Sequence, residues 1–188
     1  MYTDNGFWDT FRAVHPLFTL LYPEVSERVT QSILNAYDES GFMPEWASPG
    51  HRECMIGNNS ISLLTDAWMK GIRTICPEKA LEAMIHQTEA RHPGISSVGR
   101  DGFGYYDRLG YVPYPEVHEG TAKTLEYAYA DWCVARFADS IGRKEIADTY
   151  YRKALNYRNL YYPDYGFMWA KDANGKWRDA FDATEWGG

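Results

Sequence analysis

The sequence is poor in cysteine, and the three cysteines that it has are far apart. Cys54, Cys76 and Cys133 are odd in number, and none of them lies at a metal-ligand spacing from another. They therefore fit neither a disulfide framework nor a zinc cluster. Because free cysteine behaves as a small apolar residue, we expect each of them to be buried as one.

The sequence also lacks runs of Lys and Arg, and its formal net charge is −7 at pH 7. Nucleic acids and anionic membranes are bound through basic patches, so neither is expected as the main partner. No stretch is long and apolar enough to span a bilayer, and no basic-then-apolar signal precedes the first expected helix. Because the motif-like YTDNGFWD follows Met1 directly, we expect the chain to be a segment of a longer polypeptide.

The local motifs of several enzyme classes are missing as well. The sequence has no GxSxG elbow, P-loop, dinucleotide-binding fingerprint, HExxH or EF-hand loop. What remains is a set of carboxylates, aromatic rings, Arg and His. This composition suits carbohydrate binding, or glycoside hydrolysis by two carboxylates, but it does not identify which two.

Apolar and aromatic residues, in contrast, are abundant. Hydrophobic residues make up 45% of the 188, which suits one globular unit with a sizeable core. Aromatic residues reach 16%, with seven Trp and fifteen Tyr, and many of them lie beside Gly and Pro. Such rings either stack on the flat face of a ligand or pack at the ends of helices, and composition alone leaves both interpretations open.

Six helices are predicted, and they form three pairs. The first, third and fifth are apolar on most sides and are expected to be buried, whereas the second, fourth and sixth each have one apolar face. Pro16 lies inside the first helix and predicts a kink there. The predicted ranges are 7–22, 24–39, 60–72, 77–91, 121–141 and 143–161.

The lengths of the connections predict how these helices are arranged. The links within each pair are short, whereas the links between pairs, Gly41–Asn59 and His92–Gly120, are long. Antiparallel hairpins would place both long loops at one end, as a rim above two layers of helices. An open solenoid and a closed α/α barrel both satisfy this pattern. The hairpins begin near residues 7, 60 and 120, a spacing too long and uneven for a tetratricopeptide array, which favours part of a barrel.

The C-terminal region departs from the helical rhythm. In GFMWAKDANGKWRDAF, two apolar runs flank Asn174-Gly175, a pair of residues typical of tight hairpin turns. The expected fold class is therefore all-α, built from antiparallel helical hairpins, with a short β-hairpin near the C-terminus.

The loop Gly41–Asn59 is the strongest candidate for a ligand site. Links between packed helices usually have two to eight residues, and this loop is much longer and chemically dense. We expect it to line a polar site, with four candidate side chains: Glu45, Trp46, His51 and Arg52. A loop histidine is often only a structural hydrogen-bonding residue, so the case for His51 depends on its neighbours. Asn58 and Asn59 precede the third helix and are expected to cap it.

A second group of candidates lies at the start of the first helix. Asp9 and Arg12 are three residues apart, so they share a helical face beside Trp8. Asp9 could accept hydrogen bonds from ligand hydroxyls while Trp8 supports a sugar ring. The structural alternative is that Asp9 favours the helix dipole and pairs with Arg12.

The second long loop and the fifth helix add further polar groups. Glu126 lies in the mostly apolar TLEYAYADW, where a carboxylate needs a partner, and we expect a structural bond to a neighbouring loop. The loop is rich in tyrosine and carboxylates, but no spacing within it singles out a pair: Arg100, Asp101, Tyr105, Tyr106, Asp107, Tyr111, Tyr114, Glu116, His118 and Glu119.

Several long blocks of the sequence resemble glycoside hydrolase family 92, the calcium-dependent exo-acting α-mannosidases. In chain order they are YTDNGFWDTFRAVHPL, PEWASPGHRECMIG, SLLTDAWMKGIR, SVGRDGFGYYDRLGYVPY, TAKTLEYAYADW, ALNYRNLYYPDYGFM and the final EWGG. The resemblance covers essentially the whole chain without a large gap. One departure is that Asn58-Asn59 stands where many relatives have an acidic residue followed by His.

This resemblance implies an (α/α)6 catalytic barrel, of which residues 1–188 would be the first half, without the family's preceding β-sandwich domain. Family members invert the anomeric centre with a Glu acid and Asp residues that activate water, and calcium helps to bind and distort mannose. The acid is expected shortly after Trp186-Gly187-Gly188 and the base much later. Asp182 and Glu185 are therefore not assigned as acid and base, and the calcium ligands are expected outside this chain.

By this resemblance the chain would be an inactive fragment of an inverting exo-α-mannosidase that acts on glycans, for example on α1,2-linked mannose. Its partners would be mannose-containing glycans and the rest of its polypeptide, in a secreted, periplasmic or cell-surface location. The alternatives are a non-catalytic helical module that binds carbohydrate or protein, and another (α/α)6 glycosidase such as a glucosidase or trehalase relative. The residues expected to bind sugar are Trp8, Asp9 and Arg12, with Glu45, Trp46, His51 and Arg52.

Overall fold

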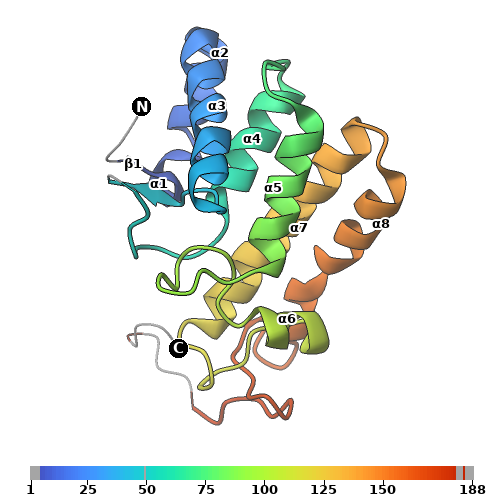
Figure 1. The fold of residues 1–188 in the computed structure, drawn as a ribbon. Coiled ribbons are helices and arrows are strands. Elements are labelled where there is room, and N and C mark those ends of the chain that lie inside the picture. The colour runs from blue at the N-terminus through green and yellow to red at the C-terminus, as the bar shows by residue number, and fades with distance from the viewer. Residues whose placement is uncertain (1–4, 49, 181–183, 185–188) are drawn as a thin grey trace.

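The computed structural model describes residues 5–48, 50–180 and 184, and the fold is mainly helical (Figure 1). Two small antiparallel strand pairs accompany the helices. The elements in chain order are β1 (Asn5–Gly6), α1 (Phe7–Thr10), α2 (Val14–Leu21), α3 (Pro23–Ser40), β2 (Trp46–Ala47), α4 (Asn59–Met69), α5 (Pro77–Glu89), α6 (Phe103–Leu109), α7 (Gly120–Ser140), α8 (Lys144–Lys153), the 3-10 helix η1 (Asn156–Leu160), β3 (Tyr161–Tyr162) and β4 (Phe167–Met168).

The predicted hairpins are present and give a partial helical barrel. The short links α2–α3, α4–α5 and α7–α8 lie at one end of the molecule, and the long loops lie together at the other end (Figure 1). Local sequence explains the boundaries. Pro23 and Pro77 occupy the first positions of α3 and α5, where a missing N–H costs nothing. Gly41, with φ of 81°, ends α3 in the left-handed conformation that glycine adopts readily.

The core lies between an inner and an outer layer of helices. α4 and α7 pack on each other, and the outer helices α3, α5 and α8 pack against them. Ile61 and Leu64 of α4 and Val134 and Phe137 of α7 are completely buried. Because both inner helices are covered on most sides, their polar groups at the rim are held on a rigid base.

The first predicted helix was wrong in two respects. It is divided into α1 and α2 by residues 11–13, and Pro16 causes no kink because it lies in the first turn of α2, where its N–H would have no partner within the helix. Leu17 is 48% exposed and Leu20 is 76% exposed, so α2 is not buried. The reason is its position at the edge of the partial barrel, where within the described residues it packs on α3 and α4 along one side only.

Other boundaries also differ from the predictions. The sixth helix ends at Lys153, and the second long loop contains α6, which was not predicted. A hairpin is present near the C-terminus, but its ladder pairs β3 with β4 rather than the runs around Asn174-Gly175. At that turn the described chain forms one isolated bridge, between Lys171 and Trp177.

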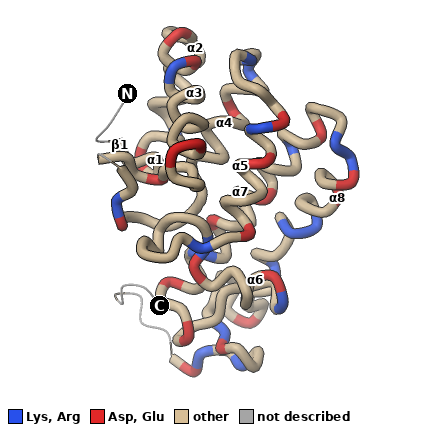
Figure 2. Tube along the Cα trace, in the orientation of Figure 1, with Lys and Arg blue, Asp and Glu red and all other residues tan. Residues whose placement is uncertain are grey.

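The cysteine prediction is confirmed for one residue of three. Cys133 is buried in α7, Cys54 is partly buried at the rim, and Cys76 is exposed just before α5. Cys76 occupies the N-cap position of α5. This position is on the surface, in the short link between α4 and α5. No helix in the described part of the chain is long and apolar enough to cross a membrane. Along the trace, Lys and Arg are interspersed with Asp and Glu (Figure 2).

Candidate functional site

Hydrogen bonds join the two long loops to each other at the rim. The carboxylate of Glu53 accepts hydrogen bonds from the hydroxyl of Ser96 (2.6 Å) and from its backbone N–H (3.3 Å), and both bonds lower the pKa of Glu53. The backbone N–H of Cys54 donates to the hydroxyl of Ser97 at 3.1 Å. Residues more than forty positions apart are thus fixed side by side, which creates a shared wall for a site.

Beside this wall lies a cleft of about 650 Å³ with a mainly apolar lining, which we call the rim cleft. Trp8 and three stretches of chain line it, namely residues within 53–57, 96–101 and 118–127. Its volume lies within the range of small-ligand sites. The cleft contains four carboxylates against one lysine, and the four are Glu53, Asp101, Glu119 and Glu126.

The wall formed by α1 is held by Glu126, which projects from α7. Arg12 forms an ion pair with the Glu126 carboxylate at 3.8 Å, and the Trp8 indole also interacts with this carboxylate. The guanidinium of Arg12 also lies over the Trp8 ring, 4.8 Å from its centroid. Burial raises the pKa of Glu126, and Arg12 and Trp8 act in the opposite direction. Glu126 therefore has the partners that its apolar setting required, namely Trp8 of α1 and Arg12 of the turn that follows α1.

Another part of the cleft is fixed by Asp101. Its Oδ1 pairs with Nε of Arg91 at 3.2 Å, and its Oδ2 pairs with Nζ of Lys123 at 3.0 Å. Lys123 is buried in the first turn of α7, where a cation is unfavourable to the helix dipole. A lysine at that position was the one sequence signal that could have pointed to a nearby carboxylate.

Beneath the cleft lies a buried ion pair. Arg100 and Asp131 are 1% and 0% exposed, and their side chains approach to 2.8 Å. The hydroxyl of Tyr106 donates to Asp131 at 2.7 Å, and Nε of Arg100 donates to the side-chain oxygen of Asn58 at 2.8 Å. This cluster joins the loop before α6, α6 itself, α7 and the start of α4. Asn58 occupies the N-cap position of α4, as predicted, but its side chain is used for this junction and makes no capping hydrogen bond.

The structure places Glu45 inside the protein rather than in the rim cleft. Its two oxygens accept hydrogen bonds from the backbone N–H of Ser60 (3.1 Å), the hydroxyl of Ser60 (2.9 Å) and Nε2 of Gln87 (3.0 Å). It therefore satisfies the first turn of α4, the task that the sequence suggested for Asn58 and Asn59. Burial raises the pKa of Glu45 to about 8, against the effect of these hydrogen bonds.

The other candidates from the Gly41–Asn59 loop point to different places. Trp46 in β2 packs closely over Gly6, where an added Cβ would approach the indole to 2.6 Å. Arg52 is exposed and donates to the hydroxyl of Ser48 at 3.3 Å. Asp9 is exposed in α1 and is not among the residues that line the rim cleft. Within the described residues Arg12 pairs with Glu126, and no ion pair with Asp9 forms.

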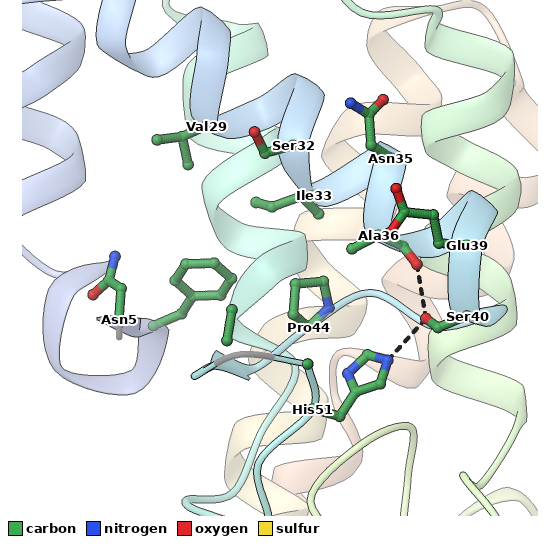
Figure 3. Close-up of a pocket in the computed structure, with 13 residues that line it drawn as sticks. Asn5, Val29, Ser32, Ile33, Asn35, Ala36, Glu39, Ser40, Pro44 and His51 are labelled. Carbon is green, nitrogen blue, oxygen red and sulfur yellow. Dashed lines mark hydrogen bonds between the residues drawn. The ribbon is translucent and has the colours of Figure 1, made fainter. Parts of the chain in front are cut away.

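His51 lines a separate cavity of about 280 Å³ between α3 and the loop (Figure 3). Its Nε2 lies 2.8 Å from the hydroxyl of Ser40, at the C-terminal end of α3. The walls are mostly apolar, with Phe7, Val29 and Ile33 among them. His51 thus connects the loop to an outer helix. Of the seven predicted sugar-binding residues, the structure brings Trp8 to the rim cleft, with Arg12 stacked on it.

The described residues do not provide a metal site. No group of three or more His, Cys, Asp or Glu side chains within residues 5–48, 50–180 and 184 could hold a metal ion. Asp182, Glu185 and the stretch 186–188 lie outside the described residues.

Comparison with known proteins gives consistent matches. A model of the glycosyl hydrolase family 92 catalytic domain matches residues 1–188. The family GH92 inverting mannosidase BT2199 from Bacteroides thetaiotaomicron VPI-5482 is 83% identical, with a TM-score of 0.97 over 100% of this chain and 25% of that chain. The GH92 α-mannosidase BT3965 from Bacteroides thetaiotaomicron, solved with mannoimidazole, is 35% identical, with a TM-score of 0.86 over 94% of this chain and 23% of that one.

A curated relative from Arthroderma benhamiae is described as an uncharacterized secreted glycosidase. It is 26% identical over 167 residues, which are 77% of this chain and 21% of the relative. The chain therefore spans about a quarter, or slightly less, of the length of the relatives that it matches.

Proposed function

This chain belongs to glycoside hydrolase family 92, and on that premise we propose that it supplies one wall of the mannose site of an inverting exo-α-mannosidase. The acid and the base are assigned to parts of the polypeptide outside the described residues. The observation that carries the proposal is the rim cleft, in which the Trp8 indole is fixed at one wall and carboxylates surround it.

The arrangement suits the chemistry of a hexopyranose. A sugar ring presents C–H groups on its faces and hydroxyls around its edge. The Trp8 ring offers a flat apolar surface for those C–H groups, and the cleft carboxylates accept hydrogen bonds from hydroxyls. These side chains would bind and orient the sugar, while an acid and a base on opposite sides of the glycosidic bond would cleave it.

Calcium dependence is part of the proposal as a property of the full-length polypeptide. When bound, the ion would contribute oxygen ligation of sugar hydroxyls. The ligands of the ion are proposed to lie outside this chain, so no step of this chain is assigned to the ion. A secreted, periplasmic or cell-surface location is proposed from the family, and the secreted fungal relative supports it.

The test compares the full-length polypeptide with the segment 1–188 on an α-mannoside and measures released mannose. We expect turnover only by the full-length protein, loss of turnover with EDTA and recovery with calcium. Parallel assays with α-glucosides and trehalose examine the other glycosidase classes. Turnover by the segment alone would overturn the assignment of the acid and base to other residues. Turnover of α-glucosides or trehalose but not of α-mannosides would overturn the substrate class.

A further inference from the structure

Glu126 occupies the point at which three segments of the chain meet. It projects from α7, contacts Trp8 and Arg12 of the region around α1, and lies against Gly57 at the end of the first long loop. A Cβ at Gly57 would lie 3.0 Å from Oε2 of Glu126 and 3.1 Å from its Cβ. Gly57 has φ of 92°, so the loop needs glycine there both for its backbone and for the space beside Glu126.

The contacts of Trp8 restrict its ring on two sides. The Arg12 guanidinium covers the ring at 4.8 Å from its centroid, and the Glu126 carboxylate interacts with the indole. Arg12 is itself held by the ion pair with Glu126. One carboxylate therefore interacts with both the indole and the cation that covers it, and the indole lines the rim cleft.

A purely structural role would not require a carboxylate at this position. The Glu126 side chain is 20% exposed on a largely buried helix. Removing a charge from water costs free energy unless favourable contacts with the buried group offset that cost. What the chain gains here is a single orientation of a flat aromatic side chain at the wall of a cleft.

We propose that Glu126 is a positioning residue, which fixes the plane of Trp8 so that the indole is preorganised for stacking on a sugar ring. The inference rests on the proposed function, because it assigns Trp8 to the sugar-binding wall. Preorganisation tightens binding by removing the entropy cost of ordering the ring, and it should act on the ground state and the transition state alike.

The test uses the full-length polypeptide, with initial rates of α-mannoside hydrolysis for four variants. Glu126→Leu removes the acceptor at similar size, Glu126→Gln keeps an acceptor, and Trp8→Phe keeps a ring without the N–H. Glu126→Leu should raise KM by about tenfold, the effect of one charge-assisted hydrogen bond, with kcat changed less than about twofold. Glu126→Gln should recover most of this loss. Glu145→Leu, at an exposed glutamate of α8, is the matched control and should leave KM unchanged.

A double-mutant cycle decides whether Glu126 acts through Trp8. In the Trp8→Phe background, where no N–H remains to be held, Glu126→Leu should raise KM by less than about twofold further. Independent, multiplying effects of the two substitutions would overturn the proposal, as would an unchanged KM in Trp8→Phe. A loss of kcat in Glu126→Gln of more than about a hundredfold would also overturn it, because that is the effect of removing a catalytic acid.

The cycle is interpreted for variants whose thermal melts match the wild type. If Glu126→Leu does not fold, the KM of Trp8→Phe and of Glu126→Gln still decides the question. A wild-type protein that is inactive on α-mannosides would refute the proposed function, whereas an active protein with an unaltered KM in Glu126→Leu would refute only this inference.

Discussion

The buried Glu45 predicts an unusual dependence of stability on pH. Burial raises its pKa from 4.5 to about 8 in the folded protein, whereas the unfolded chain ionises it near 4.5. The stability associated with this group is therefore fully present below pH 4.5 and is lost as the pH rises toward 8. With about 1.4 kcal/mol for each pKa unit, the loss amounts to roughly 5 kcal/mol.

Replacement by Gln removes this titration. Glu45→Gln keeps the shape, and its amide oxygen can still accept from the Ser60 hydroxyl and from Gln87. Its NH2 group cannot accept from the backbone N–H of Ser60, so about 1 kcal/mol is lost at any pH. Below pH 4.5 the variant should be less stable than the wild type by about that amount. Above pH 8 it should be more stable, by about 4 kcal/mol, so the order of the two proteins reverses between these values.

The measurement is the difference in melting temperature between wild type and variant, taken by calorimetry on the full-length polypeptide from pH 4.5 to pH 8.5. Glu24→Gln, at an exposed glutamate in the first turn of α3, reports the effect of removing one surface charge. A difference that keeps one sign across the range would refute the reasoning. It would mean that the start of α4 and its hydrogen bonds hold Glu45 ionised in spite of burial.

Three further predictions follow from other parts of the structure. Gly57→Ala should lower stability by about 1–3 kcal/mol and raise KM for an α-mannoside, because it combines a strained backbone with a close approach to Glu126; melts and initial rates on the full-length protein check both effects. Asp131→Asn should lower stability by about 3–5 kcal/mol, since it leaves the Arg100 charge buried without its partner, whereas replacing both members by apolar residues should cost less. Leu20→Asp should destabilise the full-length protein if the rest of the barrel covers α2, and an unchanged melting temperature would show that this residue faces water there.

The parts of the fold that depend on local periodicity could be predicted from the sequence. The stripe of Val29 and Ile33 in α3 is buried, and the mostly apolar α4 and α7 form the inner layer. The exposure of Leu17 and Leu20 could not be predicted in the same way. The pattern of apolar residues on a helix indicates which faces are suited to burial. It does not indicate whether another helix packs against each of those faces.

The candidate site was harder to predict because its groups meet across long sequence separations. Glu45 satisfies the first turn of α4 from fifteen residues away, so its position in a dense loop resembled that of a ligand-binding residue. Glu126 showed only that it needed a partner, and the sequence could not indicate that Trp8 and Arg12 supply it. The resemblance to a family predicts that Trp8 binds sugar, and the structure places Trp8 in the lining of the rim cleft.

The contacts of the rim-cleft carboxylates support the proposal that the acid and the base lie in another part of the polypeptide. Inverting hydrolysis requires one carboxyl group that can give a proton and another that can take one, on opposite sides of the bond. Asp101 uses one oxygen for Arg91 and the other for Lys123, which leaves it poorly placed to activate water.

Glu126 is bound by Trp8 and Arg12, and Glu53 accepts two hydrogen bonds from Ser96. Among the contacts within the described residues, Glu119 is the one cleft carboxylate that is not held in this way. A single carboxylate cannot serve as both acid and base. These contacts suit the described wall to holding a sugar in place, as the proposed function requires.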